Sequence, residues 1–215
     1  MKVYGIIGAG GFGREAMHTF VSSKKNNTDT VFYIDDNIKT SEIDGIKVLK
    51  YEDFLKLKNE KLINIAISDY KIREKLYRIS IKSGVSFFSI VANNVVIMNN
   101  SNIGVCSILQ PFVTITNNVK IGKCFQANLY SYVGHDCVIG DFVTFAPSVR
   151  CNGNIIVENN VYLGTGVTIK QGTASKPLII GQGSIIGMNS IISKSVPKNS
   201  IVINQSIKTF NKKIS

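Results

Sequence analysis

The residue pair best suited to chemistry in this chain is a histidine followed directly by an aspartate. His135 and Asp136 lie in the segment GHDCVIGDF, residues 134–142. A neutral imidazole is an effective general base near neutral pH, and an adjacent carboxylate fixes its tautomer and increases its basicity. Cys137 follows the pair but is expected to face inward, so no serine or cysteine nucleophile is evident beside it. This favours direct group transfer over a covalent enzyme intermediate. The second histidine, His18, falls in a predicted helix and receives no role.

A strict six-residue period surrounds His135. Every sixth residue from Val91 to Ile169 is apolar, and the position four residues later in each hexad is small or apolar. Neither an amphipathic helix nor an alternating strand has this period. It indicates a parallel β-helix, in which three hexads make one triangular coil and apolar side chains stack in a central column. His135 is the third residue of its hexad, so we expect its side chain at the outer edge of a coil.

The first ninety residues predict a different architecture. Apolar strands alternate with helices, which indicates a small parallel, Rossmann-like α/β domain. The segment GAGGFG, residues 8–13, follows the first strand and precedes a helix expected from about Arg14, while Asp35 and Asp36 end the second strand. Glycines of this kind let backbone N–H groups approach a phosphate, and carboxylates accept hydrogen bonds from ribose hydroxyls.

The glycine motif alone is compatible with NAD, but the domain is too short for the two mononucleotide-binding halves of a dinucleotide site. The diphosphate of a nucleotide sugar fits half of the motif. A tight turn without a ligand is the other interpretation, because the glycine pattern is weak evidence on its own. We expect residues 1–90 to form this domain, residues 91–203 to form the β-helix with an inserted loop near 171–178, and residues 204–215 to form a tail.

The composition of the chain limits the kinds of partner that it is expected to bind. The net charge of +11 fits an anionic small molecule, whereas nucleic-acid binding is disfavoured because the lysines are scattered through the chain. No apolar run approaches a membrane span, and the first residues lack a secretory segment, so we expect a cytoplasmic protein. The four cysteines lack the spacing of a zinc site, which favours packed, reduced thiols and no metal.

The combination of GAGGFG, of FYIDD at residues 32–36 and of GHDCVIGDF resembles one family of hexapeptide-repeat sugar acetyltransferases. This family includes the bacillosamine-pathway and perosamine N-acetyltransferases and the sialic acid O-acetyltransferases. The resemblance covers nearly the whole chain. It implies a left-handed β-helix, a homotrimer, and acetyl-CoA bound in the groove between adjacent β-helices.

The resemblance also implies roles for individual residues. His135 matches the general base, and Asp136 matches its acidic neighbour. The nucleotide-linked substrate is expected at Gly10, Gly11, Phe12, Asp35 and Asp36, and acetyl-CoA at Thr144, Gly153, Thr165, Gly187 and Met188. The chain departs from the family in three places: Thr144 and Phe12 stand where some members have histidines, and residues 204–207 replace the usual Gly-x-Pro-Ala.

The leading hypothesis is an acetyl-CoA-dependent N-acetyltransferase that acts on a nucleotide-linked 4-amino-4,6-dideoxyhexose in surface glycan biosynthesis, with UDP or dTDP favoured over GDP. A sialic acid O-acetyltransferase is the nearest alternative, since it contains the same α/β domain. A non-catalytic β-helix scaffold is the third hypothesis, and the His135–Asp136 pair argues against it. A zinc enzyme of the carbonic anhydrase type is disfavoured because one histidine in the array cannot supply a three-histidine site.

Overall fold

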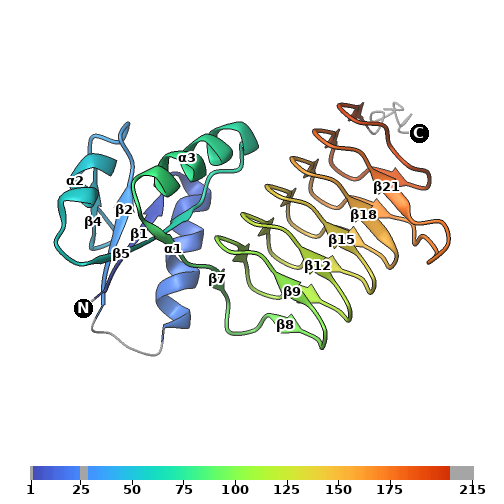
Figure 1. Ribbon diagram of the computed structural model, residues 1–215, viewed down its shortest axis with the longest axis horizontal. Coiled ribbons are helices and arrows are strands. Elements are labelled where there is room, and N and C mark those ends of the chain that lie inside the picture. Colours follow the sequence, from blue (N-terminus) through green and yellow to red (C-terminus); the bar gives the residue numbers. More distant parts are fainter. Residues whose placement is uncertain (1, 25–28, 204–215) are drawn as a thin grey trace, which may run out of the picture.

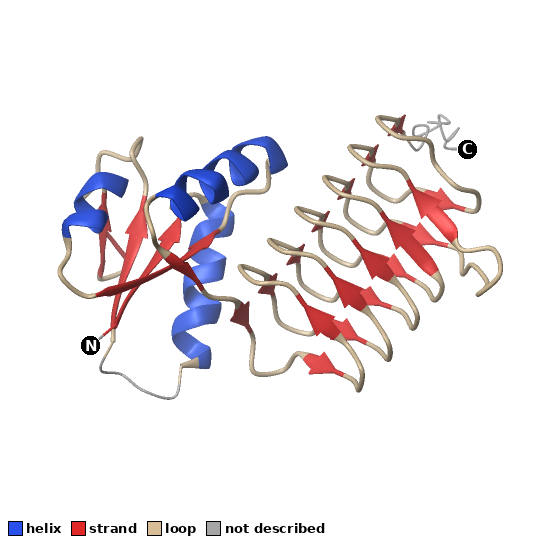
Figure 2. Cartoon of the chain, viewed as in Figure 1, coloured by secondary structure: helices blue, strands red, loops and turns tan. Residues whose placement is uncertain are grey.

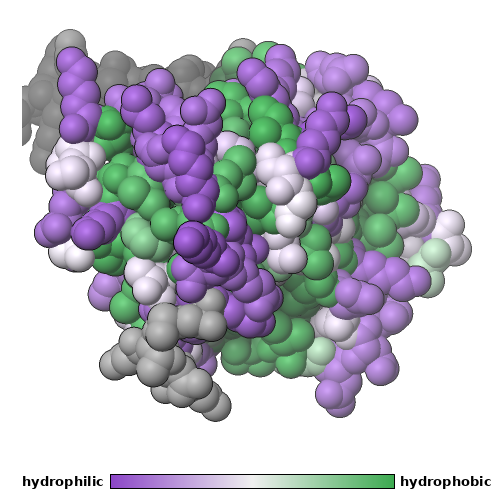
Figure 3. Space-filling view, turned by 60° about the vertical axis from the view of Figure 1, so that its left-hand side comes forward, coloured by the Kyte–Doolittle hydropathy of each residue, from purple (hydrophilic) through white to green (hydrophobic). Residues whose placement is uncertain are grey.

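The computed structural model describes residues 2–24 and 29–203, so the predicted tail, residues 204–215, lies outside the described residues. An α/β unit and a stack of triangular coils lie side by side, with the coils extending away from the unit (Figures 1 and 2). On the face seen in Figure 3, hydrophilic side chains are interspersed with hydrophobic ones. None of the helices in the described part of the chain is long and apolar enough to cross a membrane.

The α/β unit is built on one sheet with the strand order β3-β4-β2-β1-β5-β6. Its elements are β1 (Lys2–Ile7), α1 (Gly11–Ser23), β2 (Thr30–Ile34), β3 (Glu42–Ile43), β4 (Ile46–Leu49), α2 (Tyr51–Lys56), β5 (Glu60–Ile65), α3 (Tyr70–Lys82) and β6 (Ser86–Phe87). All pairs are parallel except β3 with β4. The chain leaves β1 toward β2 on one side and reaches β5 on the other, so the carboxyl ends of β1 and β5 form the topological switch point where such sheets bind ligands.

The coils are built from strands of two or three residues. They are β7 (Ile90–Val91), β8 (Val96–Ile97), β9 (Asn102–Ile103), β10 (Ile108–Leu109), β11 (Thr114–Ile115), β12 (Lys120–Ile121), β13 (Gln126–Ala127), β14 (Tyr132–Val133), β15 (Val138–Ile139), β16 (Thr144–Phe145), β17 (Arg150–Cys151), β18 (Ile155–Val157), β19 (Tyr162–Leu163), β20 (Thr168–Ile169), β21 (Leu178–Ile180), β22 (Ile185–Ile186), β23 (Ile191–Ile192) and β24 (Ile201–Val202). Each strand in the regular part pairs in parallel with the strand eighteen residues away; Tyr132, for example, pairs with Thr114 and with Arg150. Three hexads therefore complete one coil, as the period predicts.

Three flat faces result, and we name each by one of its strands. The β16 face contains β7, β10, β13, β16, β19, β22 and β24; the β14 face contains β8, β11, β14, β17, β20 and β23; the β15 face contains β9, β12, β15, β18 and β21. The His135 edge joins the β14 and β15 faces, and its corners are residues 134–136 and their equivalents on other coils. The Tyr130 edge joins the β16 and β14 faces through residues 128–130 and their equivalents.

The sharp turns at the corners require a left-handed backbone conformation, which explains why asparagines occur there. Residues in the left-handed region recur every six positions, and three of them, Asn100, Asn118 and Asn160, each follow another asparagine in the sequence. Asparagine adopts this conformation at lower cost than most residues. Inside the coils, the apolar column from Leu109 to Ile169 is buried, as predicted. All four cysteines are buried and free.

The α/β unit packs on the first coils of the β16 face. Arg73 of α3 is fully buried there, and its guanidinium donates to the carbonyls of Ile67, Ser68 and Phe142, to Gln126 Oε1 and to Thr144 Oγ1, at 2.6–3.0 Å. Burial lowers the pKa of Arg73 to about 10, which leaves it protonated at neutral pH. On the other side of the contact, Thr19 of α1 donates to Gln110. These bonds fix the orientation of the unit on the coils.

Candidate active site

The His135 corner is organised by hydrogen bonds along the chain and between coils. The imidazole is half exposed, and its Nδ1 lies 2.7 Å from Asp136 Oδ2. Asn118 occupies the equivalent corner one coil earlier, and its Nδ2 donates to Asp136 Oδ1 at 2.6 Å. Asp136 itself adopts the left-handed conformation of the turn (φ 59°), which brings its side chain beside the preceding residue. Two neighbours therefore hold the carboxylate in one place.

This geometry determines which ring nitrogen is basic. The hydrogen bonds from His135 and Asn118 hold the pKa of Asp136 below its ordinary value. Because the pKa in the folded state is depressed, the favourable interaction is present above the ordinary pKa of aspartate and is lost only as the pH falls through the depressed value. An ionised carboxylate only accepts hydrogen bonds, so Nδ1 carries the proton of the neutral ring and Nε2 keeps its lone pair.

The Nε2 side of the imidazole lies against Gly153, at the corner of the following coil. A Cβ atom on Gly153 would overlap Nε2, Cε1 and Cδ2 of His135. The backbone of Gly153 is not in the left-handed region, so the absent side chain makes room for the ring and does not serve a turn. The structure thus brings together His135, Asp136 and Gly153, three of the predicted site residues.

We expect Gly153→Ala to impair catalysis with little loss of stability. The new methyl group would displace the imidazole by a few tenths of an ångström or more, and a misplacement on the order of 1 Å costs roughly a hundredfold in rate. We therefore expect kcat to fall about 10- to 100-fold with a nearly unchanged melting temperature. Steady-state kinetics and calorimetry of the same preparation would check this. An unchanged kcat would show that the position of the ring over Gly153 does not matter.

Three other predicted acetyl-CoA residues lie on a different edge. Thr165, Gly187 and Met188 belong to the Tyr130 edge, and the side chains of Thr165 and Met188 are exposed. The β14 face separates this edge from His135 within one chain. The two sets meet only if the Tyr130 edge of one chain faces the His135 edge of another.

Thr144 lies elsewhere. It points outward from the β16 face, is only 2% exposed, and accepts a hydrogen bond from Arg73 beneath the α/β unit. Because the α/β unit covers Thr144, its hydroxyl is not accessible to a ligand in this structure. The same burial makes Thr144 part of the contact between the α/β unit and the coils.

The predicted substrate residues gather at the carboxyl edge of the α/β sheet. Helix α1 begins at Gly11, three residues earlier than expected, because Gly10 has extended backbone and acts as the N-cap. Gly10 and Gly11 are exposed, and the space where their Cβ atoms would lie is open. Phe12, in the first turn of α1, is partly buried. The N-terminus of α1 is therefore accessible, as anion binding at a helix end requires.

The two aspartates hold neighbouring loops in place. Asp35 accepts hydrogen bonds from the backbone N–H groups of Ala9 and Asn37, each at 3.0 Å. Asp36 accepts from the N–H of Tyr51, the first residue of α2, at 2.8 Å. Asp35 thereby connects the end of β2 to the glycine loop. The glycines and aspartates form one group, separate from the His135 corner.

Sequence reasoning missed Arg73, which looked like one more surface cation in a lysine- and arginine-rich helix. It also missed Asn118. The coil period could have revealed this residue, because Asn118 precedes Asp136 by one full coil of eighteen residues. No three or more His, Cys, Asp or Glu side chains converge into a metal-binding group among residues 2–24 and 29–203.

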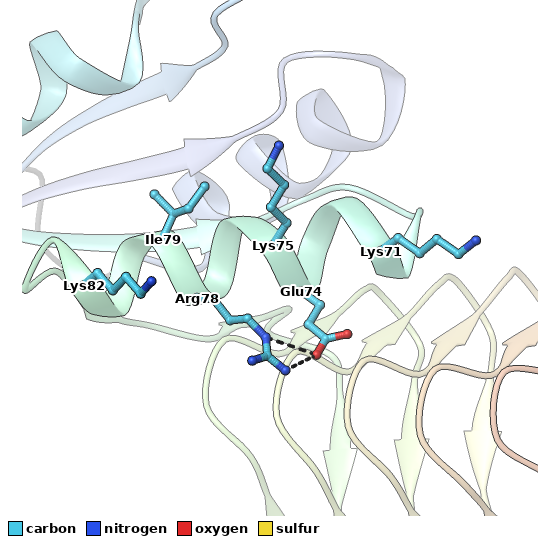
Figure 4. A pocket seen from close by; sticks show the side chains of 6 residues that line it. All are labelled: Lys71, Glu74, Lys75, Arg78, Ile79 and Lys82. Carbon is cyan, nitrogen blue, oxygen red and sulfur yellow. Dashed lines mark hydrogen bonds and ion pairs between the residues drawn. The ribbon is translucent and has the colours of Figure 1, made fainter.

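A hollow on the outer side of α3 lacks an arrangement of base and carboxylate like that of the His135 corner. It is lined by Lys71, Glu74, Lys75, Arg78, Ile79 and Lys82 (Figure 4). Glu74 and Arg78 form an ion pair at 2.6 Å across one helical turn, while Lys71 and Lys82 extend toward opposite ends of the helix. The hollow lies on the surface of a single helix, so we assign no catalytic role to it.

Fold and site together define a class of protein, the β-helix acyltransferases with an N-terminal α/β domain. The family model of the PglD N-terminal domain matches residues 5–79. The GDP-perosamine N-acetyltransferase of Escherichia coli O157:H7 is 42% identical over 187 residues, which cover 85% of each chain. The chain therefore belongs to the family of left-handed β-helix sugar acetyltransferases, and it is an acyltransferase.

Solved structures agree with this assignment. WeeI from Acinetobacter baumannii AYE is 45% identical and superposes with a TM-score of 0.88 over 95% of this chain and 97% of that one. The acetyltransferase domain of PglB from Neisseria gonorrhoeae FA1090, in complex with acetyl coenzyme A, has a TM-score of 0.83 at 19% identity over 93% and 94% of the two chains. The latter similarity concerns the fold. The predicted fold class, a Rossmann-like domain followed by a left-handed parallel β-helix, is confirmed.

Proposed function

We propose that this protein transfers the acetyl group of acetyl-CoA to the 4-amino group of a nucleotide-linked 4-amino-4,6-dideoxyhexose, with His135 as the general base. The observation that carries the proposal is the half-exposed imidazole whose Nδ1 binds Asp136, in a chain that belongs to this acetyltransferase family. The geometry leaves Nε2 free to accept a proton at the side of the ring next to Gly153.

The reaction proceeds by direct attack. The neutral sugar amine adds to the thioester carbonyl carbon, a C–N bond forms, and the carbonyl oxygen becomes an oxyanion. Nε2 of His135 accepts the proton that the amine nitrogen loses. The oxyanion then collapses, the C–S bond breaks, and the imidazolium returns the proton to the departing thiolate. We propose that the backbone N–H of Gly153 stabilises the oxyanion, an effect that typically amounts to a few kcal/mol.

The α/β unit supplies the binding energy for the acceptor. The open N-terminus of α1 at Gly10 and Gly11 faces the diphosphate, and Phe12, Asp35 and Asp36 surround the nucleoside. Binding of this remote part positions the amine, so that contacts far from the reacting atoms serve the chemistry. The name of the 42% identical relative favours a GDP-linked acceptor over the UDP- and dTDP-linked sugars that the sequence suggested.

The active site is completed by a homotrimer in this proposal. The Tyr130 edge carries exposed apolar side chains: Phe112 and Tyr130 stack with ring centroids 4.8 Å apart, and Met188 is 67% exposed. Ile191, on the adjacent β14 face, is 80% exposed. Apolar groups exposed together mark interaction surfaces. If each Tyr130 edge faces the His135 edge of the next chain, Thr165, Gly187 and Met188 reach the base, and three copies close the ring.

We expect Tyr130→Arg to dissociate the trimer and to abolish activity, because the substitution places a charge in an apolar contact between chains. Sedimentation equilibrium should give three times the chain mass of 23.6 kDa for the wild type and the mass of one chain for the variant. Val105→Arg is the matched control, since Val105 is 52% exposed on the edge that joins the β15 and β16 faces. A trimeric Tyr130→Arg variant would refute this arrangement.

The proposed reaction is tested by thiol release from acetyl-CoA. The acceptor panel contains GDP-, UDP- and dTDP-linked 4-amino-4,6-dideoxyhexoses and free sialic acid. We expect turnover with one of the nucleotide amino sugars, and with the GDP-linked sugar first. Turnover with sialic acid alone would replace N-acetylation by O-acetylation. Absence of turnover with every acceptor, together with absence of CoA binding, would support the scaffold hypothesis.

A further inference from the structure

One position of the corner turn repeats along the His135 edge. Asn100, Asn118, Asp136 and Asn154 occupy this position on four successive coils, and all four adopt the left-handed conformation, with φ between 56° and 59°. Asparagine is favoured there because its short polar side chain tolerates the left-handed region. Asp136 thus places one carboxylate in a column of three amides, directly after the candidate base.

The hydrogen bond between Asn118 and Asp136 joins two side chains across coils. Asn118 Nδ2 donates to Asp136 Oδ1 at 2.6 Å, while the other carboxylate oxygen, Oδ2, lies 2.7 Å from Nδ1 of His135. The backbone of Asp136 is bound separately, since its N–H donates to the carbonyl of Asn117 at 3.1 Å. The side-chain amide of Asn118 is therefore not needed to connect the two turns.

Corner side chains on the edge that joins the β15 and β16 faces make a different kind of bond. Asp141 Oδ1 accepts a hydrogen bond from the backbone N–H of Lys123 at 3.0 Å, and Asn159 Oδ1 accepts one from the backbone N–H of Asp141 at 2.8 Å. These bonds connect each coil to the backbone of its neighbour and so serve the fold. The amide of Asn118 instead binds a carboxylate whose other oxygen faces the base.

The carboxylate of Asp136 is exposed enough to need such a restraint. Its side chain is 45% exposed, and that of His135 is 48% exposed. A side chain in water moves between staggered rotamers, and an exposed ion pair by itself orders its partners weakly. The second bond, to Asn118, selects the orientation in which Oδ2 points at Nδ1. In this orientation the ring proton stays on Nδ1, and Nε2 lies next to Gly153.

We infer that Asn118 is a positioning residue for the general base: it holds the Asp136 carboxylate so that Oδ2 keeps the His135 ring in the tautomer with its proton on Nδ1. The inference rests on the proposed function, in which Nε2 accepts the proton of the sugar amine. Asn118 acts through Asp136 and does not contact the reacting atoms. Its contribution therefore belongs to kcat and to the state of the ring, and not to the binding of either substrate.

The kinetic test uses Asn118→Gly, which removes the amide and keeps the turn, because glycine adopts the left-handed conformation without strain. We expect kcat to fall roughly 5- to 10-fold, a factor typical of one lost hydrogen bond, with both KM values unchanged. The matched control is Asn100→Gly, which makes the same change one coil farther from Asp136. Its kcat should stay within about twofold of the wild-type value.

A double-variant cycle with Asp136→Gly shows whether Asn118 acts through the carboxylate. Once Asp136 is absent, the further change Asn118→Gly should leave kcat unaltered, because residues that act through one another are not additive. A full additional loss in the double variant, or a raised KM in Asn118→Gly, would mean that Asn118 contacts a substrate directly. Either result would overturn the inference.

The tautomer of the ring gives a readout that does not depend on turnover. The chain contains two histidines, so nitrogen-15 NMR of labelled histidine in a His18→Ala background reports on His135 alone. At alkaline pH, where the ring is neutral, the nitrogen shifts distinguish a protonated nitrogen from one with a lone pair. We expect a proton on Nδ1 when Asn118 is present, and a mixture of the two tautomers in Asn118→Gly.

The two measurements separate this inference from the proposed reaction. If no acceptor is acetylated but the tautomer depends on Asn118, the proposed reaction fails and the positioning role stands. If an amino sugar is acetylated and Asn118→Gly retains both the wild-type kcat and a single tautomer, the positioning role fails and the reaction stands. A reduced kcat with an unchanged tautomer would also contradict the inference, because the loss would then not arise from the orientation of the ring.

Discussion

His135→Ala should lower kcat by about 10²- to 10⁴-fold, the range in which a positioned general base contributes to catalysis. Without the imidazole, the amine must lose its proton to water while the C–N bond forms. The imidazole is 48% exposed and its ion pair with Asp136 lies at the surface, so the fold should tolerate its loss. We expect the same trimer and nearly the same melting temperature. Thiol release at saturating acetyl-CoA measures the effect.

His18→Ala is the matched control for this prediction. His18 is exposed on α1, and the substitution should leave kcat within twofold of the wild type. Asp136→Asn should give an intermediate loss, because an amide can donate to Nδ1 and thereby favour the tautomer whose Nε2 is already protonated. A His135→Ala enzyme with wild-type kcat would mean that another group, or the solvent, accepts the proton.

Arg73→Ala should be the most destabilising substitution of a charged residue in the chain. The guanidinium is fully buried, and the five groups that accept its hydrogen bonds are neutral. Its removal leaves three carbonyls, an amide and a hydroxyl without these donors, and creates a cavity between the α/β unit and the coils. We expect a loss of about 3–5 kcal/mol in the free energy of unfolding, by analogy with broken buried charge networks. The melting temperature should fall by roughly 10 °C.

Arg78→Ala provides the comparison within the same helix. Arg78 pairs with Glu74 one turn away, and its side chain is 73% exposed. Its replacement should change the free energy of unfolding by no more than about 0.5 kcal/mol. Arg73→Lys should fall between the two alanine variants, since one ammonium group cannot reproduce the fork that serves acceptors on both units. Equal melting temperatures for Arg73→Ala and Arg78→Ala would show that the polar contact does not hold the two units together.

The β-helix was predictable because the need to bury apolar side chains recurs at a short, fixed interval along the sequence. The coils from Leu109 to Ile169 bury the same positions, so these residues reveal the period without knowledge of the tertiary structure, whereas Val91 and Ile97 of the first coil are exposed. The outward position of His135 followed from counting residues within its hexad. The α/β unit was predictable in class from alternating strands and helices, but the start of α1 was missed because the glycine run suggested a loop as far as residue 13.

Contacts between distant segments were not predictable in the same way. The sequence around Arg73 does not distinguish a buried guanidinium from the exposed one of Arg78, because the difference arises from packing of α3 on β13 and β16. Thr144 was assigned to acetyl-CoA by its position in a motif, whereas its surroundings are set by the α/β unit above it. Lys170, Lys176 and Lys194 line one hollow only because the coils stack two corners of the same edge.

The most direct test of the central claim is to identify the product. Enzyme, acetyl-CoA and GDP-perosamine are incubated together, and the sugar nucleotide is recovered and analysed by mass spectrometry and NMR. The proposed function predicts a mass increase of one acetyl group and an amide at the C4 nitrogen that resists hydroxylamine. An acetyl ester that hydroxylamine removes would contradict the proposed N-acetylation. A GDP-sugar left unchanged while a UDP-linked amino sugar is acetylated would contradict the proposed nucleotide.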